Sequence, residues 1–160
     1  MSQSGEDAVD SKMPGGIEAH AGVWEGTFTH RDADTGEVRD RHRSWVEVGV
    51  RGDKYAQRNR YEWDDGRKET LVFYGAVRNG RVEIAGSGVR GYAVCLDEGA
   101  VVFYGQKEAQ ALSFVDVITK TGEDARARTW QVFDGKRVCT IVHVVERRVC
   151  TRDVYDEIAQ

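Results

Sequence analysis

Short segments in which apolar and polar residues alternate follow one another from Gly22 to about Tyr155. Alternation with a period of two is typical of strands that bury one face. Turn sequences such as Asp34-Thr35-Gly36 and Asn79-Gly80 separate the segments, because Gly and Asn tolerate the positive φ of tight turns. The pattern predicts ten strands, near residues 22–31, 41–50, 54–63, 68–78, 81–86, 89–96, 100–107, 110–120, 125–133 and 137–148.

A meander of this length favours a closed sheet, because an open sheet would leave two long edges whose unpaired backbone groups promote aggregation. We therefore predict an all-β fold, an antiparallel up-and-down β-barrel of about 8–10 strands. Residues 19–160 are expected to form this single domain, since 160 residues suffice for one hydrophobic core. Residues 1–18 are rich in Ser, Gly, Asp and Glu and are predicted to be a disordered N-terminal leader. A short helical turn is expected near residues 16–21.

The strand near residues 54–63 places polar and aromatic side chains on its inner face. Tyr55, Gln57, Asn59, Tyr61 and Trp63 alternate there with mostly charged residues, which we expect in water. A dry core would favour aliphatic side chains, since a buried amide without a partner costs about 1–3 kcal/mol. Gln57 and Asn59 therefore indicate a cavity that holds water or a ligand. The alternative is that these amides bond to each other or to the main chain near the rim.

Two other strands add aromatic residues to the same lining. Trp24 and Phe28 share one face of the first strand, and Trp24 is expected to plug one end of the barrel. Phe73 lies on the corresponding face of the fourth strand. These three rings would shape the pocket around a small molecule.

The strand near residues 125–133 supplies a further polar candidate. Arg126 and Arg128 are expected to face water with Trp130 beside them, so Gln131 on the opposite face is assigned to the cavity. The complete set of predicted substrate-binding residues is Trp24, Phe28, Gln57, Asn59, Tyr61, Phe73 and Gln131.

Two ionisable residues in apolar surroundings are the predicted catalytic residues. His143 lies in a strand whose two faces are both apolar, and histidine titrates near neutrality, which suits proton transfer. Asp116 shares a strand face with Phe114 and Ile118. If that face points inward, burial would raise the pKa of Asp116 and make it a candidate general base. The alternatives are a core histidine bonded to a neighbour and an aspartate that faces water.

Composition excludes several classes of partner. The chain has 23 Lys and Arg against 27 Asp and Glu, a formal net charge of −4, whereas a nucleic-acid-binding domain would be basic. No apolar run reaches the roughly 18 residues that span a bilayer, and the N-terminus lacks the basic-then-apolar order of a secretion signal. Cys95, Cys139 and Cys150 form no CxxC pair and are predicted to be buried free thiols, which suits a reducing compartment. We therefore predict a cytoplasmic protein with no nucleic-acid or membrane partner.

Sequence motifs for P-loop nucleotide binding, zinc proteases and serine hydrolases are absent, since no GxxxxGK[ST], HExxH or GxSxG pattern occurs. His20, His30 and His42 are scattered, mostly beside charged residues, and their separation from His143 gives no spacing argument for a shared site. We therefore predict no metal and no cofactor.

Five stretches resemble the uncharacterised calycin-like domains related to lipocalins, namely residues 22–30, 32–34, 41–44, 60–67 and 126–135. The resemblance covers most of residues 20–148, and its Gly22-Val23-Trp24 opening is similar to the lipocalin one. It implies a small antiparallel barrel whose interior binds an apolar or conjugated small molecule. It implies no reaction, because barrels of this kind serve as carriers and as enzymes. Trp24, Gly26 and His143 also look like the haem-binding nitrobindin barrels, which use a late histidine on the iron, although the rest of that motif is missing.

Two functions from different classes fit these predictions. The first is a cofactor-free cyclase or isomerase that folds an apolar or conjugated biosynthetic intermediate, since holding reacting groups together supplies roughly 7–11 kcal/mol in the best cases. The polar lining residues would polarise a carbonyl, and His143 or Asp116 would move a proton. The alternative is a non-catalytic carrier or sensor of a hydrophobic small molecule, with haem as a distant candidate. A homodimer is also considered, and docking through an exposed strand edge is a third, weaker hypothesis.

Overall fold

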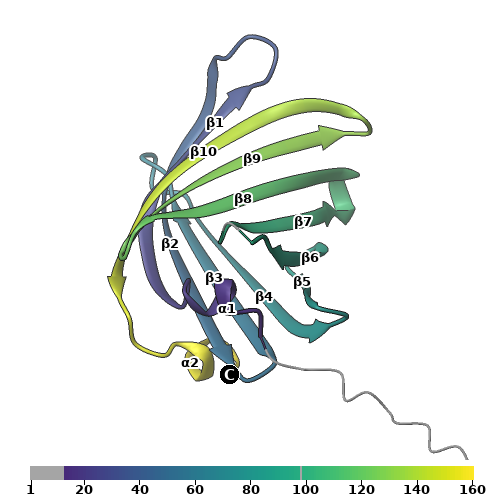
Figure 1. The fold of residues 1–160 in the computed structure, drawn as a ribbon. Coiled ribbons are helices and arrows are strands. Elements are labelled where there is room, and N and C mark those ends of the chain that lie inside the picture. The colour runs from purple at the N-terminus through teal and green to yellow at the C-terminus, as the bar shows by residue number, and fades with distance from the viewer. Residues whose placement is uncertain (1–12, 98) are drawn as a thin grey trace, which may run out of the picture.

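Ten antiparallel strands close into one barrel in the computed structural model, which describes residues 13–97 and 99–160 (Figure 1). Each strand pairs with its neighbours in the sequence, and the first pairs with the last to complete the barrel. The predicted all-β, up-and-down, calycin/lipocalin-like fold is therefore confirmed. The strands are β1 (Gly22–Asp32), β2 (Val38–Arg51), β3 (Lys54–Glu62), β4 (Lys68–Arg78), β5 (Arg81–Gly86), β6 (Val89–Cys95), β7 (Val101–Lys107), β8 (Leu112–Gly122), β9 (Ala125–Asp134) and β10 (Arg137–Cys150).

Two-residue turns with positive φ set the register of the short hairpins. Asn79 and Gly80 have φ values of 53° and 73°, as the predicted Asn-Gly turn between β4 and β5 requires. Ser87 and Gly88, at 46° and 75°, make the same kind of turn between β5 and β6. The Ser87 hydroxyl accepts a hydrogen bond from the Val72 amide (2.8 Å) and donates one to the Val72 carbonyl (3.2 Å). This turn is therefore tied to β4, a contact that turn propensity alone does not predict.

A short helix, α1 (Gly15–Glu18), closes one end of the barrel and lies at its lower end in Figure 1. Ile17 and the preceding Met13 are 2% and 1% exposed, and both belong to the core cluster that contains Trp24. The expected helical turn is thus present, slightly earlier than predicted. Residues 13–18 belong to the barrel, so the predicted disordered leader does not extend to residue 18. Residues 1–12 lie outside the described residues.

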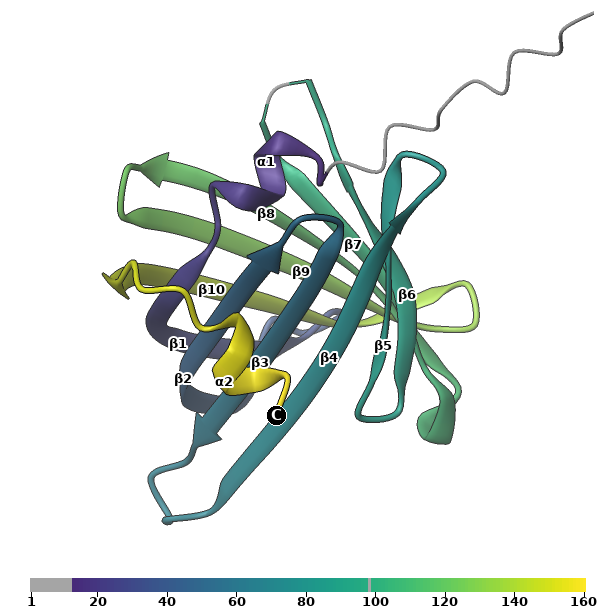
Figure 2. The same cartoon turned by 90° about the horizontal axis from the view of Figure 1, so that it is seen from below.

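A C-terminal helix, α2 (Tyr155–Ile158), lies on the outside of β2 and β3 (Figure 2). Ile158 packs there with Ala56, which is fully buried although it lies on the face of β3 expected in water. Glu47 on the same outer surface is also buried, and its Oε1 accepts a hydrogen bond from Arg58 Nη2 (2.9 Å). The outer surface of the barrel is therefore partly covered, because the chain returns to it after β10.

The interior of the barrel is divided into three layers. An apolar cluster around Trp24 fills the end near α1, and a second cluster around Phe28 occupies the opposite half. Four buried charged residues lie between them: Arg126, Arg128, Asp116 and Glu146. Arg126 lies over the Trp24 ring and Arg128 over the Phe28 ring, at 4.1 and 5.5 Å from the ring centroids. The prediction that these two arginines face water is therefore wrong.

A 3₁₀ turn, η1 (Glu108–Gln110), joins β7 to β8. In the described part of the chain, no helix has both the length and the apolar character needed to cross a membrane. Cys95, Cys139 and Cys150 are free thiols of intermediate burial, so they are less buried than predicted.

Candidate functional site

A cavity of about 260 Å³ occupies the half of the barrel away from α1. Its wall is largely aromatic and includes Phe28, Tyr61, Trp63, Phe73, Phe103, Phe114 and Trp130. Phe114 and Trp130 stack, with ring centroids 4.9 Å apart and planes inclined by 16°. Gly105 on the neighbouring strand makes room for this stack, because a Cβ there would lie 2.5 Å from the Phe114 ring. The volume is at the lower end of ligand pockets, and the flat aromatic wall suits a planar molecule.

The structure brings six of the nine predicted site residues together at this cavity. Those that line it are Phe28, Gln57, Asn59, Tyr61, Phe73 and Asp116. Trp24 is fully buried, but it packs in the cluster near α1, as the predicted plug. Gln131 and His143 are exposed. A ligand in the cavity would therefore contact the six residues that line it, and not Trp24, Gln131 or His143.

Gln131 and His143 face outward because their neighbours in the sequence face inward. Val142 and Val144 in β10 are 0% and 1% exposed, so the side chain of His143 between them lies on the opposite face. In β9, Trp130 lines the cavity, so Gln131 points away from it. The assignments of Gln131 to the cavity and of His143 to proton transfer inside the barrel are therefore wrong. The resemblance to the nitrobindin barrels also fails, because His143 cannot reach a group bound in the cavity.

The inward polar residues of β3 form a continuous hydrogen-bonded ladder. The Tyr55 hydroxyl donates to Gln57 Oε1, Gln57 Nε2 donates to Asn59 Oδ1 (2.8 Å), and Asn59 Nδ2 donates to the Tyr61 hydroxyl oxygen (2.9 Å). The sequence left two interpretations of Gln57 and Asn59, a bond between the two amides or a position in the wall of a cavity. The structure shows both, because the amides bond to each other and also line the cavity. Burial raises the pKa of Tyr61 to about 12, so its hydroxyl keeps its hydrogen at neutral pH. The Tyr61 hydroxyl oxygen accepts the last hydrogen bond of the ladder, and its own hydrogen takes no part in the ladder. The Tyr61 hydroxyl can therefore donate this hydrogen to a ligand.

A charge-balanced ion cluster forms the floor of the cavity. Arg128 donates from Nη2 to Asp116 Oδ2 (2.6 Å) and from Nη1 to Glu146 Oε1 (3.2 Å). Arg126 Nε donates to the other oxygen of Glu146, and Arg126 Nη1 donates to His20 Nδ1 (3.2 Å). Two guanidinium groups and two carboxylates therefore neutralise one another. Arg128 and Asp116 are the members that line the cavity.

Burial and ion pairing oppose each other within this cluster. Burial alone would raise the pKa of Glu146, but Arg128 and Arg126 together lower it below the usual value. Burial alone would lower the pKa of Arg128, but Asp116 and Glu146 raise it. For Asp116 burial prevails over Arg128, so its pKa is raised. Asp116 thus faces inward with a raised pKa, as predicted for an inward position, but Arg128 holds one of its two oxygens.

The buried His20 leads us to expect a loss of stability in acid. Burial, and then Arg126, lower the pKa of His20 to about 3, whereas an unfolded chain titrates near 6.5. Between these values the unfolded chain binds the proton and the folded chain does not, so the free energy of unfolding rises with pH. The stabilisation is complete above pH 6.5 and falls toward pH 3 by at most about 1.4 kcal/mol per pH unit.

Urea unfolding at several pH values from 6.5 to 5 measures this slope. We expect His20→Gln to reduce the slope, because the glutamine oxygen still accepts from Arg126 but does not titrate. Part of the slope should remain, since the pKa values of His30 and His42 are also lowered, mainly by burial. The exposed His143 gives the control variant His143→Gln, which should keep the full slope. An equal slope in His20→Gln and the parent would show that His20 is not protected from protonation.

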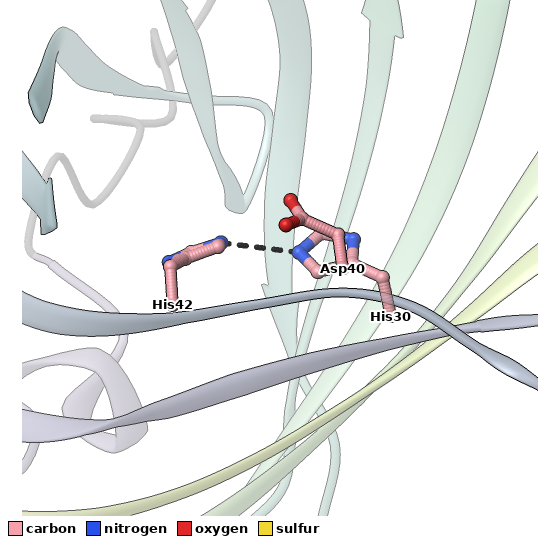
Figure 3. A group of neighbouring side chains, drawn as sticks. All are labelled: His30, Asp40 and His42. Atoms are coloured by element: carbon pink, nitrogen blue, oxygen red, sulfur yellow. Dashed lines mark hydrogen bonds between the residues drawn. The ribbon is translucent and has the colours of Figure 1, made fainter. Parts of the chain in front are cut away.

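Three side chains that commonly bind metals meet at the open end of the cavity: His30, Asp40 and His42 (Figure 3). Their ligand atoms lie within 4.8 Å of one another, and the two Nε2 atoms are 3.1 Å apart. The His42 ring stacks on Phe28, with centroids 5.0 Å apart and planes inclined by 17°. Burial, and then His42, lower the pKa of His30 to about 4, so this ring is neutral at pH 7. The expectation that the histidines stand apart is wrong for this pair.

The register of the first hairpin is the signal that could have identified this cluster. His30 and His42 are both six residues from Gly36 in the predicted turn. Residues at equal distances from a hairpin turn lie close together on the two strands, with side chains on the same face. In the structure His30 pairs with Asp40, and Phe28 pairs with His42. The observed register is centred one residue earlier, on Thr35, so His30 lies opposite Asp40 and His42 is its diagonal neighbour on the same face. Counting from the turn therefore places the two histidines near each other, although a search for sequence motifs leaves them apart.

Comparison with known proteins supports the fold and gives no family. No family model and no curated protein sequence matches the chain. The S-type phycobiliprotein lyase CPES from Guillardia theta superposes with a TM-score of 0.65 at 12% identity, over 82% of this chain and 89% of that one. A protein of unknown function from the DUF3598 family of Nostoc punctiforme superposes with a TM-score of 0.66 at 16% identity, over 86% of this chain and 50% of that one. This chain thus spans about half of the second protein. At these identities the similarity is one of fold, that of a calycin-like barrel.

Proposed function

We propose that the protein binds a planar, conjugated small molecule in the barrel cavity. The observation that carries the proposal is a pair of polar atoms in residues that line the cavity. Trp130 Nε1 and Asp116 Oδ1 are buried and have no hydrogen-bond partner within residues 13–97 and 99–160. Buried polar atoms in native proteins are almost always bonded, so a ligand or water is expected to complete them. Trp130 offers a donor and Asp116 an acceptor, which favours a ligand that carries both kinds of group.

The shape and charge of the cavity narrow the ligand class further. The stacked rings of Phe114 and Trp130 offer a flat surface, and the Phe28 ring meets Trp130 edge-on, with planes 82° apart. Aromatic surfaces of this kind favour planar π-systems. The four charges of the floor cancel, so the floor gives an anion no net attraction. We therefore expect an uncharged ligand whose polar end reaches Asp116 and Tyr61.

Titration with Nile red tests the proposal, because this dye is planar, uncharged and fluorescent in apolar surroundings. We expect saturable binding of one dye per chain. Trp130→Ala should weaken binding about 10–100-fold, or about 1.4–2.8 kcal/mol, since it removes both a stacking surface and the free N–H. The matched control is Gln131→Ala, the next residue of β9, which faces outward and should leave the affinity unchanged. Non-saturable binding, or an equal loss in both variants, would count against a ligand in the cavity.

The cofactor-free cyclase or isomerase is the second candidate function. Asp116 Oδ1 and the Tyr61 hydroxyl favour it, because one can accept a proton while the other polarises a carbonyl. The fold admits enzymes, since one structurally similar protein is named a lyase. In this mechanism Asp116 acts as the general base, as predicted. The Tyr61 hydroxyl and Asn59 polarise the carbonyl, a role that the sequence analysis had also given to Gln131. Without turnover, the protein is a carrier or sensor.

Identification of the natural ligand separates these two functions. Native mass spectrometry of the protein from its own host, followed by extraction, would supply the molecule to be tested for conversion. In an enzyme, Tyr61→Phe should lower kcat more than the affinity, because the ring remains and only the hydroxyl is lost. In a carrier no product forms, and Tyr61→Phe changes the affinity alone.

A further inference from the structure

We propose that His30, Asp40 and His42 form a binding site for one divalent transition-metal ion at the open end of the cavity. The three side chains come from the adjacent strands β1 and β2 and lie close to one another (Figure 3). Two imidazoles and one carboxylate are a ligand set that zinc and non-haem iron sites use, with the other positions left to water or a substrate. The site goes beyond the proposed function, because it does not depend on which molecule the cavity binds.

The spacing of the two imidazoles fits a shared metal ion. Their Nε2 atoms are 3.1 Å apart. With Zn–N bonds of about 2.0–2.1 Å, this separation corresponds to an N–Zn–N angle of roughly 95–102°, between the octahedral and tetrahedral values. The ligand atom of Asp40 lies within 4.8 Å of both nitrogens, so the three ligand atoms form a triangular set.

His42 already has the tautomer that metal binding requires. Its Nδ1 lies 3.3 Å from the carbonyl oxygen of Arg43, and because a carbonyl only accepts, Nδ1 carries the hydrogen and Nε2 carries a lone pair. Histidines that bind metals commonly donate their second N–H in this way, which fixes the orientation of the ring. In the metal-free protein His30 Nε2 donates to His42 Nε2. A metal ion replaces this hydrogen bond when the proton of His30 moves to Nδ1.

Asp40 is held in place by its own partners. Its Oδ1 accepts hydrogen bonds from Trp63 Nε1 (2.9 Å) and from the Arg41 amide (3.0 Å). Both bonds go to the same oxygen, so within the described residues Oδ2 remains for a metal. The Trp63 ring also packs on His42, with centroids 4.7 Å apart. Two of the three ligands are thus fixed before any ion arrives, which reduces the ordering that binding requires.

Zinc titration of the tag-free, chelator-stripped protein tests the site directly. We expect one Zn²⁺ per chain in competition with a chromophoric chelator, and a loss of affinity of at least about 100-fold in His30→Asn and in Asp40→Asn. Trp63→Phe keeps the ring but frees Asp40, so it should weaken binding about 10–100-fold. The exposed His143 gives the matched control His143→Asn, which should bind Zn²⁺ like the parent. Urea unfolding of each variant confirms that the barrel remains folded.

Substitution with Co²⁺ gives an independent measurement, because its visible absorption reports coordination by nitrogen and oxygen, whereas thiolate ligands add a charge-transfer band in the near ultraviolet. We expect the visible bands without the thiolate band. The proposal is overturned if binding does not saturate at one ion per chain, if His30→Asn and Asp40→Asn bind as tightly as the parent, or if the thiolate band appears. These outcomes leave the dye-binding test unaffected, so the two proposals fail separately.

Discussion

Glu146→Gln is expected to lower the free energy of unfolding by about 3–5 kcal/mol. The Glu146 side chain is 0% exposed and contacts both Arg126 and Arg128. Glutamine keeps the shape but removes the negative charge, so two buried guanidinium groups would share the single carboxylate of Asp116. Removal of one partner of a buried ion pair leaves a charge without compensation, which is why the effect is large. Equilibrium urea unfolding at pH 7 measures it.

Two further variants show whether charge is the cause. Glu62→Gln removes a carboxylate that pairs with Arg43 on the outer surface (3.0 Å), and it should cost less than about 1 kcal/mol. The double variant Arg126→Met with Glu146→Leu removes a whole pair and leaves Arg128 with Asp116, so it should recover most of the stability lost in Glu146→Gln. A Glu146→Gln variant as stable as Glu62→Gln would mean that the cluster contributes little to folding.

Trp24→Ala is expected to have a comparable effect, a loss of about 3–5 kcal/mol, because it opens a cavity in the core. Trp24 is fully buried, donates from Nε1 to the His20 carbonyl (2.9 Å) and lies under the guanidinium of Arg126 (4.1 Å). Its removal also deprives Met13 and Ile17 of part of the core on which they pack. The end of the barrel near α1 should therefore loosen first.

The matched control is Trp45→Ala, because Trp45 is a half-buried tryptophan on the neighbouring strand β2. Arg43 lies over its ring at 5.6 Å, and the substitution should cost less than half as much as Trp24→Ala. Thermal and urea unfolding of both variants give the comparison. An equal loss in the free energy of unfolding for Trp24→Ala and Trp45→Ala would indicate that the burial of Trp24 near α1 is not the source of its stabilising effect.

The fold could be predicted from the sequence because its determinants are local. The turn at Asn79-Gly80 and the alternation along each strand depend on neighbouring residues, and the observed strands follow them closely. The inward face of β3 was predictable for the same reason, since its aromatic and amide residues contrast with the charged residues between them. This contrast also located the part of the cavity that Gln57 and Asn59 line.

The sequence-based predictions were wrong in two situations. In one, both faces of a strand are apolar, so alternation does not show which face points inward. In the other, the ion-pair partners of a charged residue lie on other strands. In β10 both faces are apolar, and Val145 is 73% exposed, so hydropathy could not show that His143 faces outward. In β9 the arginines were assigned to water because charged side chains are rarely buried. Their carboxylate partners come from β8 and β10, and only the register between strands shows that Asp116 and Glu146 reach them.

The pairing of β1 with β10 determines when the barrel can form during synthesis. Residues 23–32 pair with residues 140–150, so the sheet stays open until the last strand has left the ribosome. Glu146 belongs to that strand, so Arg126 and Arg128 remain without their shared carboxylate until closure. Pairing between such distant segments is slow, because the entropy of closing the loop is lost before the contacts form. A nascent chain that stops before β10 would therefore expose two strand edges and leave Arg126 without a carboxylate partner, a state prone to aggregation.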